Sequence, residues 1–343
     1  MTTLVTGATG FVGSQVARQI VAAGGRVRVL VRRSSNLQAL DGLTVERVEG
    51  DLNDLASLDR AVRGMRRVFH VAADYRLWTR NPEEIYKTNV DGTRRFFEVA
   101  VQAGVERIVY TSTVATIAVP AHGSTLPDEQ TCATLDQMIG HYKRSKFLAE
   151  CEAIKAASAG APVVIVNPTA PVGPGDWKPT PTGRIIVDFL NGRMPAYVDT
   201  GLNLVAVEDV AAGHLLAAER GRIGERYILG ARNMTLKEIL DALAVITGRP
   251  APRVRLPHAI ALAAGYADEF FARISGREPQ IPVEGVKMSR HRMFVASDKA
   301  EKELGYQPSA VETALTTAVR WYEEHGYVRG RARAKTVTQV QAA

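Results

Sequence analysis

A glycine-rich turn near the start of the chain constrains the fold more than any other feature of the sequence. The β-prone run before it leads into Val5-Thr6-Gly7-Ala8-Thr9-Gly10-Phe11-Val12-Gly13, and residues 11–23 then carry apolar side chains at helical spacing. Glycine is needed where a chain turns tightly, where backbone approaches a pyrophosphate and where a helix packs on a strand. The helix N-terminus offers free N–H groups to phosphates. A plain Gly-rich turn is the alternative, but the strand–loop–helix context favours a dinucleotide site.

Short β-rich segments alternate with helical ones over the first 170 or so residues. The strand candidates are rich in Val, Ile and Leu, as expected of strands covered on both faces, and they span residues 4–6, 27–31, 45–48, 68–71, 108–111 and 163–166. Helical stretches lie between them, which is typical of right-handed βαβ crossovers. The sequence therefore predicts an α/β fold, a Rossmann doubly wound parallel sheet.

The pattern changes after Pro168, where prolines and glycines predict an irregular stretch up to about residue 183. Further signals follow: strands at 202–207 and 226–229, helices at 208–219, 235–247 and 311–324, and a mostly helical part over 251–325. We expect a cofactor-binding Rossmann domain at 1–170, rejoined by about 184–222. A smaller, mainly helical substrate-binding part is expected at 171–183 and 223–328, followed by a disordered tail at 329–343.

Composition excludes several classes of protein. A 46% apolar share with 23% charged residues is that of a globular protein, and the net charge of +7 comes from basic residues scattered along the chain up to the tail. We therefore expect no nucleic-acid partner. The two cysteines form no C-x-x-C pair, so we expect no metal site, no disulfide framework and a reducing compartment. No signal peptide or membrane span is evident, which favours a cytoplasmic protein.

The end of the second strand indicates which dinucleotide is bound. NAD sites usually place an Asp or Glu there, whereas this chain reads Val31-Arg32-Arg33-Ser34-Ser35-Asn36. A guanidinium suits a 2′-phosphate, so Arg32 favours NADP(H) over NAD, although both arginines could be ordinary surface charges. Asp51, after the third strand, is placed to accept from the adenine amino group, or to cap the helix predicted at 55–62, and both roles are compatible.

A second motif, Tyr142-Lys143-Arg144-Ser145-Lys146, carries acid–base chemistry. Positions i and i+4 lie on one face of a helix, so Tyr142 and Lys146 are expected to project together. A neighbouring ammonium should lower the pKa of the phenol towards the working range. Such pairs also occur by chance on solvated helices, but Thr111-Ser112-Thr113 ends the fifth strand at the sheet edge where ligands bind. Together these residues predict a carbonyl–alcohol redox site.

With these motifs, the chain resembles the extended short-chain dehydrogenase/reductases of the NAD-dependent epimerase/dehydratase family. The resemblance runs from residue 2 to about 325, and it includes Asn89 in Thr88-Asn89-Val90-Asp91-Gly92-Thr93 and the segments 207–210, 297–300 and 304–308. Within the family, the chain looks like the dihydroflavonol-reductase-like branch. Residues 70–78 further resemble the hopanoid-associated sugar epimerases.

The resemblance implies roles for individual residues. Tyr142 would be the general acid/base, and Lys146 would bind the nicotinamide ribose and tune the phenol. Thr113 would orient the substrate oxygen, where many relatives have Ser, and Asn89 would hold the active-site helix or a relay water. The expected cofactor contacts are Gly7, Thr9, Gly10, Phe11, Val12, Gly13, Arg32, Asp51, Leu52, Ala72, Ala73, Tyr142, Lys146, Pro168 and Thr169.

Other residues are assigned less specifically. Tyr75, Trp78 and Arg184 are candidates for the substrate pocket, and the two aromatic residues could equally anchor a loop. His70 is expected to be a satisfied core residue and Asp209 to be structural. The apolar segment 260–272 could be a dimer surface, a pocket lid or a membrane-surface contact, and core packing is the interpretation we favour.

Three functions are compatible with these residues. The first is an NADP(H)-dependent reductase of a ketone or aldehyde on a sugar, polyol or lipid, working as a monomer or homodimer. The second is a sugar-nucleotide epimerase with a tightly held cofactor, in which an acidic residue after the second strand would be usual. The third is a non-catalytic NADP-sensing regulator, which would be expected to lose Tyr142 or Lys146.

Overall fold

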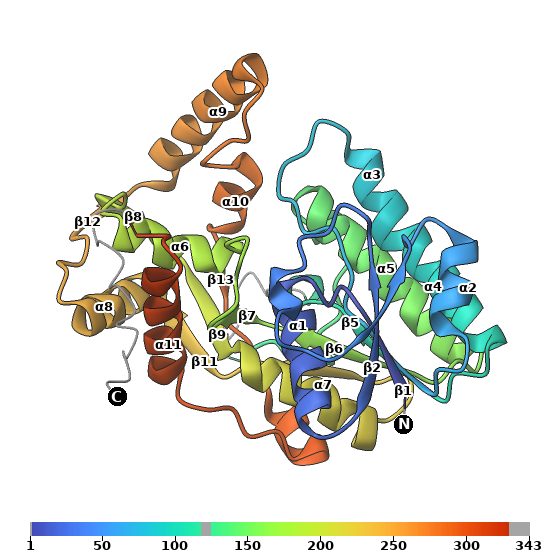
Figure 1. Cartoon of the computed structure of the whole chain (residues 1–343). Helices are drawn as coiled ribbons and strands as arrows, with labels where there is room; N and C mark the ends of the chain where they lie inside the picture. The colour runs from blue at the N-terminus through green and yellow to red at the C-terminus, as the bar shows by residue number, and fades with distance from the viewer. Residues whose placement is uncertain (1, 118–124, 329–343) are drawn as a thin grey trace, which may run out of the picture.

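The fold is built on a parallel sheet, seen in a computed structural model that describes residues 2–117 and 125–328 (Figure 1). Its strands pair in the order β10-β6-β5-β4-β1-β2-β3. They are β1 (Thr2–Thr6), β2 (Arg26–Val31), β3 (Glu46–Glu49), β4 (Arg67–His70), β5 (Arg107–Thr111), β6 (Val163–Pro168) and β10 (Arg226–Leu229). Every pairing is parallel. The predicted doubly wound Rossmann sheet is confirmed.

Helices cover both faces of this sheet because its strands are apolar on both sides. α1 (Phe11–Ala22) and α7 (Val207–Arg220) pack against each other on one face. α2 (Leu55–Val62), α4 (Gly92–Gln102) and α5 (Gly140–Ser158) cover the other. The strand order reverses between β1 and β4, so a crevice for ligands is expected outside the carboxyl ends of these two strands.

The second lobe is built from a small sheet and several helices. Its sheet contains β7 (Ala170–Val172), β9 (Gly201–Ala206), β11 (Arg232–Thr235) and β13 (Arg292–Met293), and β8 (Ala196–Val198) pairs with β12 (Val254–Leu256). The helices α6 (Pro181–Leu190), α8 (Leu236–Thr247) and α11 (Val311–Glu324) share one apolar core with this sheet. α9 (His258–Ser275) and α10 (Val283–Met288) extend from the lobe beside the Rossmann sheet's loops (Figure 1).

The structure corrects three expectations about the second half of the chain. The Rossmann domain is rejoined by 207–229, through α7 and β10, and not by 184–222, because α6 and β9 pack in the core of the second lobe. The proline-rich stretch contains β7, where Pro171 is tolerated because β7 pairs on one side only, with β9. Residues 260–272 do not pack in a core: of α9, only Gly265 and Ala272 are buried.

No helix in the described part of the chain is long and apolar enough to cross a membrane. The expected disordered tail at 329–343 lies outside the described residues. The last described element is α11, which is followed by a short turn.

Candidate active site

The glycine turn between β1 and α1 has the geometry that its sequence predicts. Gly7 has φ +70°, and a Cβ there would lie 2.7 Å from the backbone nitrogen of Ala72 after β4. A Cβ on Gly13 would lie 2.3 Å from the Gly7 carbonyl oxygen, so only glycine lets α1 approach the turn this closely. Gly10 caps α1 without a side-chain hydrogen bond, and the first turn contains no acidic residue. The helix N-terminus therefore suits a phosphate.

The predicted basic pair lies at the carboxyl end of β2. Arg32 and Arg33 are exposed just after β2, and neither guanidinium makes an ion pair with a described residue. Such a charge is available to an anionic ligand. Asp51 does not cap α2: its carboxylate accepts from the amide and the side chain of Asn53, at 2.8 and 3.0 Å, and the N-cap is Asp54. The capping half of the Asp51 expectation is therefore wrong.

Thr113 and Tyr142 come together at the carboxyl edge of the sheet. Thr113 follows β5 and caps the short 3₁₀ turn Val114–Thr116, with its Oγ1 accepting from the Ala115 amide at 3.2 Å. Tyr142 lies in the first turn of α5 and hydrogen-bonds with the Thr113 side chain. The two hydroxyls predicted to face a substrate oxygen are thus adjacent, although they are 29 positions apart in the sequence.

Lys146 is held below this pair by groups that the sequence analysis did not single out. Its side chain is buried, and Nζ donates to the Tyr110 hydroxyl at 3.1 Å and to the Thr111 carbonyl oxygen at 2.8 Å. Its ammonium also lies 4.8 Å from the centre of the Tyr110 ring. Burial lowers the pKa of Lys146 to about 8, while nearby Glu150 opposes the shift.

The expected lowering of the phenol pKa is not what the structure has. Burial raises the pKa of Tyr142, and the hydrogen bond with Thr113 opposes that rise. Lys146 directs its amine towards Tyr110 and Thr111 instead. At neutral pH the chain alone therefore holds Tyr142 as a protonated phenol.

Asn89 ties the active-site helix to the loop after β4. It is buried in the π-helical segment Lys87–Asp91, and its Nδ2 donates to the Asp74 carbonyl oxygen at 2.8 Å and to the Ser145 hydroxyl at 3.0 Å. Its Oδ1 accepts from the Asp74 amide at 2.7 Å. These contacts match the first of its two expected roles, in which it holds α5 in place.

A buried polar network behind Thr113 was missed. Asn167 Nδ2, near the end of β6, donates to the Thr113 carbonyl oxygen at 3.1 Å and to a Glu150 carboxylate oxygen at 2.7 Å. Glu150 also accepts from Thr116 at 2.9 Å and pairs with Arg226 at 3.2 Å. The sequence contained a clue to both residues. Asn167 interrupts an otherwise apolar strand, and Glu150 lies four residues after Lys146, on the same face of the helix.

Several of the remaining expected cofactor contacts follow the carboxyl ends of β3, β4 and β6. The Ala72 amide donates to the Thr6 hydroxyl at 3.2 Å, which draws the loop after β4 against the glycine turn. Leu52 is buried after β3 and Ala73 continues the loop after β4. Pro168 ends β6, and the Thr169 amide donates to the Leu229 carbonyl oxygen at 3.1 Å.

The three substrate candidates are not joined by a contact between described residues. Tyr75 is 41% exposed in the loop after β4, and its partial burial, followed by the nearby Asp176 and Asp74 carboxylates, raises its pKa. Trp78 is half-buried in the same loop. Arg184 is exposed on α6, directly after Gly183, and a Cβ at that glycine would collide with the Asp176 carboxylate. Tyr75 is thus close enough to the second lobe to interact electrostatically with the Asp176 carboxylate, whereas no contact between described residues links Arg184 to it.

Two residues expected to be structural are satisfied by the fold. His70 is buried, its ring nitrogens lie 2.9 and 3.1 Å from the hydroxyls of Thr6 and Thr93, and burial lowers its pKa to about 3. Asp209 accepts from the amide and hydroxyl of Ser309, both at 2.7 Å, and so fixes the segment before α11.

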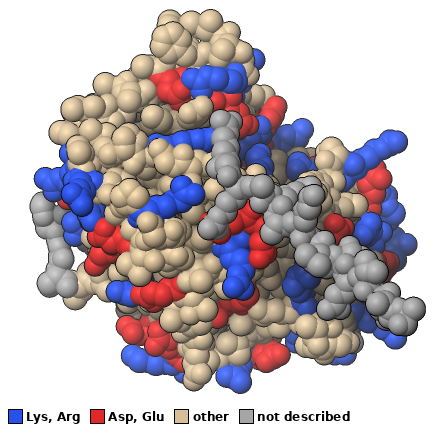
Figure 2. Space-filling model, turned by 60° about the vertical axis from the view of Figure 1, so that its left-hand side comes forward, with Lys and Arg blue, Asp and Glu red and all other residues tan. Residues whose placement is uncertain are grey.

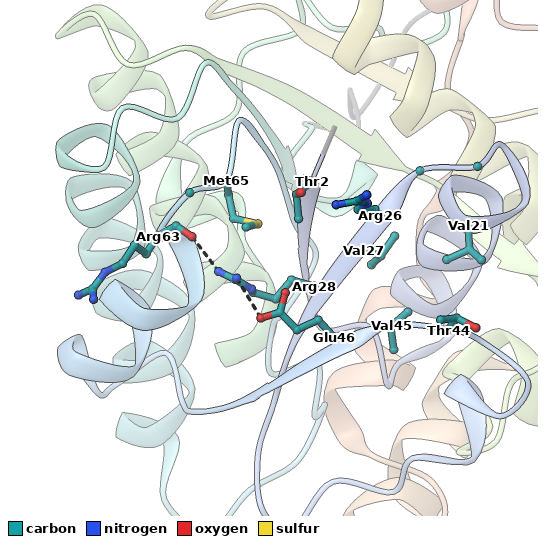
Figure 3. A pocket seen from close by; sticks show the side chains of 13 residues that line it. Thr2, Val21, Arg26, Val27, Arg28, Thr44, Val45, Glu46, Arg63 and Met65 are labelled. Carbon is teal, nitrogen blue, oxygen red and sulfur yellow. Dashed lines mark hydrogen bonds and ion pairs between the residues drawn. The ribbon is translucent and has the colours of Figure 1, made fainter.

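A surface pocket of about 730 Å³ lies elsewhere, at the amino-terminal ends of β1, β2 and β3 (Figure 3). Arg28 points into it, but its guanidinium is engaged by the Arg63 carbonyl oxygen at 2.8 Å and by Glu46 at 2.9 Å. Ligands of open α/β sheets bind at the carboxyl ends of the strands. This pocket is at the opposite edge, so we assign it no part in the site.

Comparison with known proteins agrees with this geometry. The model of the NAD dependent epimerase/dehydratase family matches residues 3–230, from the glycine turn to β10. The chain belongs to this family. Its members are extended short-chain dehydrogenase/reductases that bind a nicotinamide cofactor, so the resemblance drawn from the sequence is confirmed.

Individual relatives cover almost the whole chain. A "Putative dihydroflavonol 4-reductase" of Synechocystis is 48% identical over 95% of both chains. "Sterol demethylase protein B" of Methylococcus capsulatus is 37% identical over 96% of this chain and all of its own. A solved structure described as a nucleoside-diphosphate-sugar epimerase from Pseudomonas aeruginosa is 30% identical, with a TM-score of 0.79 over 96% of this chain and 99% of its own.

Proposed function

We propose that this family member is an NADP(H)-dependent oxidoreductase that reduces a ketone or aldehyde on a sugar, polyol or lipid-linked substrate. The observation that carries the proposal is the pairing of Thr113 with Tyr142, one helical turn before buried Lys146, at the same carboxyl edge of the sheet as the glycine turn. The relative named as a dihydroflavonol 4-reductase supports a reductive reaction.

The residues have distinct parts in such a reaction. When bound, the nicotinamide supplies the hydride that adds to the carbonyl carbon. Tyr142 gives its phenolic proton to the carbonyl oxygen, and Thr113 donates a hydrogen bond to that oxygen as negative charge develops on it. Lys146, whose amine donates to the Tyr110 hydroxyl and the Thr111 carbonyl oxygen, would hold the nicotinamide ribose. Asn89 and Asn167 position α5 and the Thr113 backbone respectively.

The choice of NADP(H) rests on Arg32 and Arg33, which are exposed after β2 with no acidic residue beside them. We expect Arg32→Ala with Arg33→Ala to weaken NADPH binding at least about tenfold, since charge-assisted hydrogen bonds contribute about 1.5–3 kcal/mol. Binding of NADH should change little.

The control is Arg47→Ala with Arg60→Ala, which removes two charges at β3 and α2, away from the crevice. Calorimetry with both nucleotides measures this, and equal losses for NADPH and NADH would refute the assignment.

The catalytic assignment is tested separately with Tyr142→Phe, which keeps the ring but removes the proton donor. Turnover of an accepted carbonyl substrate should fall by about 10²–10⁴-fold, while the melting temperature and NADPH affinity stay near those of the unaltered chain. If most activity remains, the acid must be sought at Tyr75, at His141 or at a water held by Asn89.

An epimerase is the second candidate, because of the similarity to the Pseudomonas aeruginosa protein described as a nucleoside-diphosphate-sugar epimerase. Epimerisation oxidises and re-reduces one carbon, so its cofactor must stay bound throughout. Mass spectrometry of the nucleotide that copurifies with the chain distinguishes the two reactions. Retained NAD would favour the epimerase, and freely exchanging NADPH the reductase. A non-catalytic NADP sensor is disfavoured, since Tyr142 and Lys146 are both present.

A further inference from the structure

The outward face of α9 is apolar and uncovered by described residues. Ile260, Phe270, Phe271 and Ile274 are between 55% and 70% exposed. With exposed Ala263, Ala264 and Ala267 they recur every three or four residues, which places them on one side of the helix. Exposed aromatic and aliphatic side chains gathered in this way mark an interaction surface. We call these seven residues the α9 face.

The acidic residues of α9 are turned away from this face and are engaged. Asp268 accepts from the Ile281 amide at 2.8 Å and pairs with Arg277, while Glu269 accepts from the Val283 amide at 2.8 Å. These bonds fix the segment between α9 and α10. They also leave the α9 face without a negative charge.

Basic residues are frequent on and next to α9, and the Lys287 amine lies 5.8 Å from the centre of the Tyr266 ring of this helix. Arg253, Arg273, Lys287 and Arg290 are exposed, and none forms an ion pair with a carboxylate of the described residues. The Arg80 guanidinium lies at the C-terminal end of α9, 3.6 Å from the position of a Cβ on Gly276. Residues 251–293 contain seven basic and four acidic side chains. Figure 2 shows mostly uncharged surface at the end of the molecule where Figure 1 places α9, with charged groups beneath it.

We propose that the α9 face docks this protein on an anionic lipid membrane, with the apolar side chains entering the interface and the arginines and Lys287 binding lipid headgroups. An interfacial helix combines these two features: large apolar side chains on one face and basic residues along its borders. Arg273 can extend along the helix with its charge in the headgroup layer.

A second copy of the chain fits the α9 face less well. A helix of 18 residues is about 27 Å long, so a strip about 10 Å wide covers roughly 270 Å². Stable dimers bury about 800 Å² on each partner. A symmetric contact would also bring the basic borders of two copies together, at an electrostatic cost.

The α9 face is linked to the candidate active site through α10. The Glu284 carboxylate, at the start of α10, accepts from the His141 amide at 3.0 Å, next to Tyr142 on α5. Gly285 lies against Leu77 in the loop after β4. Docking would therefore bring this side of the site close to the lipid surface. The docking itself does not depend on which reaction the site performs.

The test measures cosedimentation of the full chain with vesicles, one set of phosphatidylcholine and one of equal parts phosphatidylcholine and phosphatidylglycerol. We expect binding to the anionic vesicles that weakens at high salt. The variant Phe270→Ser, Phe271→Ser, Ile274→Ser should bind them at least about tenfold more weakly. The matched control is Val245→Ser with Ile223→Ser, at side chains 86% and 54% exposed outside the α9 face, and it should bind like the unaltered chain.

Each result has a defined meaning. NADPH affinity and melting temperature, equal in all three proteins, establish that the variants are folded. The proposal is overturned by no binding to anionic vesicles, by equal binding to neutral ones, or by equal loss in the control. It is also overturned if light scattering shows that the triple variant turns a dimer into a monomer, because the occupant would then be a second copy.

Discussion

Buried Lys146 should make the stability of this protein depend on pH in a way that one substitution isolates. The perturbation is Lys146→Met, which replaces the amine by an apolar side chain of similar length. In the folded chain burial lowers the pKa of Lys146 from an ordinary 10.5 to about 8. The unfolded chain exposes the amine to water, where the ordinary value returns.

The size and sign of the effect follow from proton linkage. Between pH 8 and pH 10.5 the unfolded chain holds a proton at Lys146 that the folded chain lacks, so this group makes the free energy of unfolding rise with pH. The slope is about 1.4 kcal/mol per pH unit. Below pH 8 both states are protonated, and the cost of the buried charge is present in full. From pH 7 to pH 10 the unaltered chain should therefore gain about 2–3 kcal/mol relative to Lys146→Met.

Urea unfolding followed by far-ultraviolet circular dichroism, at pH 7 and pH 10, measures this difference. All other titrating groups are shared by the two proteins, so their effects cancel when the two are compared at one pH. The loss of the bonds to Tyr110 and the Thr111 carbonyl is the same at both pH values, so it cancels when the two pH values are compared. The matched control is Lys155→Met, at an exposed lysine of α5, which should leave the comparison independent of pH. A difference between the unaltered chain and Lys146→Met that stays constant within about 0.5 kcal/mol would mean that the folded chain does not desolvate this ammonium.

Two further predictions concern the groups around Tyr142. Tyr110→Phe removes the hydroxyl that accepts from Lys146, so the alkaline fall in kcat should move to lower pH, and a pH–rate profile with the same midpoint would show that the bond does not tune the amine. Thr113→Val keeps the shape of the side chain and should lower kcat by about 10²–10³-fold at nearly constant KM, whereas Thr113→Ser should lower kcat only slightly. Steady-state kinetics measure both variants, and equal kcat values for the two would exclude a role for the hydroxyl.

The Rossmann half of the fold could be predicted because its constraints are local. Strands covered on both faces leave apolar runs in the sequence, and all six expected strands lie within one or two residues of β1 to β6. The glycine turn could also be predicted, since position 7 needs a positive φ and the backbone around position 13 leaves no room for a Cβ. The boundary at 184–222 failed because β9 and α7 are adjacent in the chain but lie in different sheets and cores, and nothing in their local patterns records that.

The partners of the expected site residues could not be predicted, because they depend on tertiary contacts. The i, i+4 spacing places Tyr142 and Lys146 on one face, but the bond from Lys146 goes to Tyr110, 36 residues earlier. Asn167 and Glu150 meet behind Thr113 only because β6 and α5 pack beside β5. For α9 the sequence pattern did not decide the environment, since a stripe of Ile, Phe and Ala looks the same whether it packs in a core or faces solvent.

The protonation state of Tyr142 bears on the direction of the chemistry. A reductase begins its catalytic step with a protonated phenol, because the carbonyl oxygen must gain a proton as hydride arrives. An epimerase begins with the opposite step, in which the same group must remove a proton from an alcohol. Burial raises the pKa of Tyr142, and Lys146 is directed at Tyr110 and the Thr111 carbonyl, so the chain's own groups favour the protonated phenol at neutral pH. The proposed reduction starts from this protonated form, whereas an epimerase would first have to remove the proton, at a cost that burial of the phenol increases.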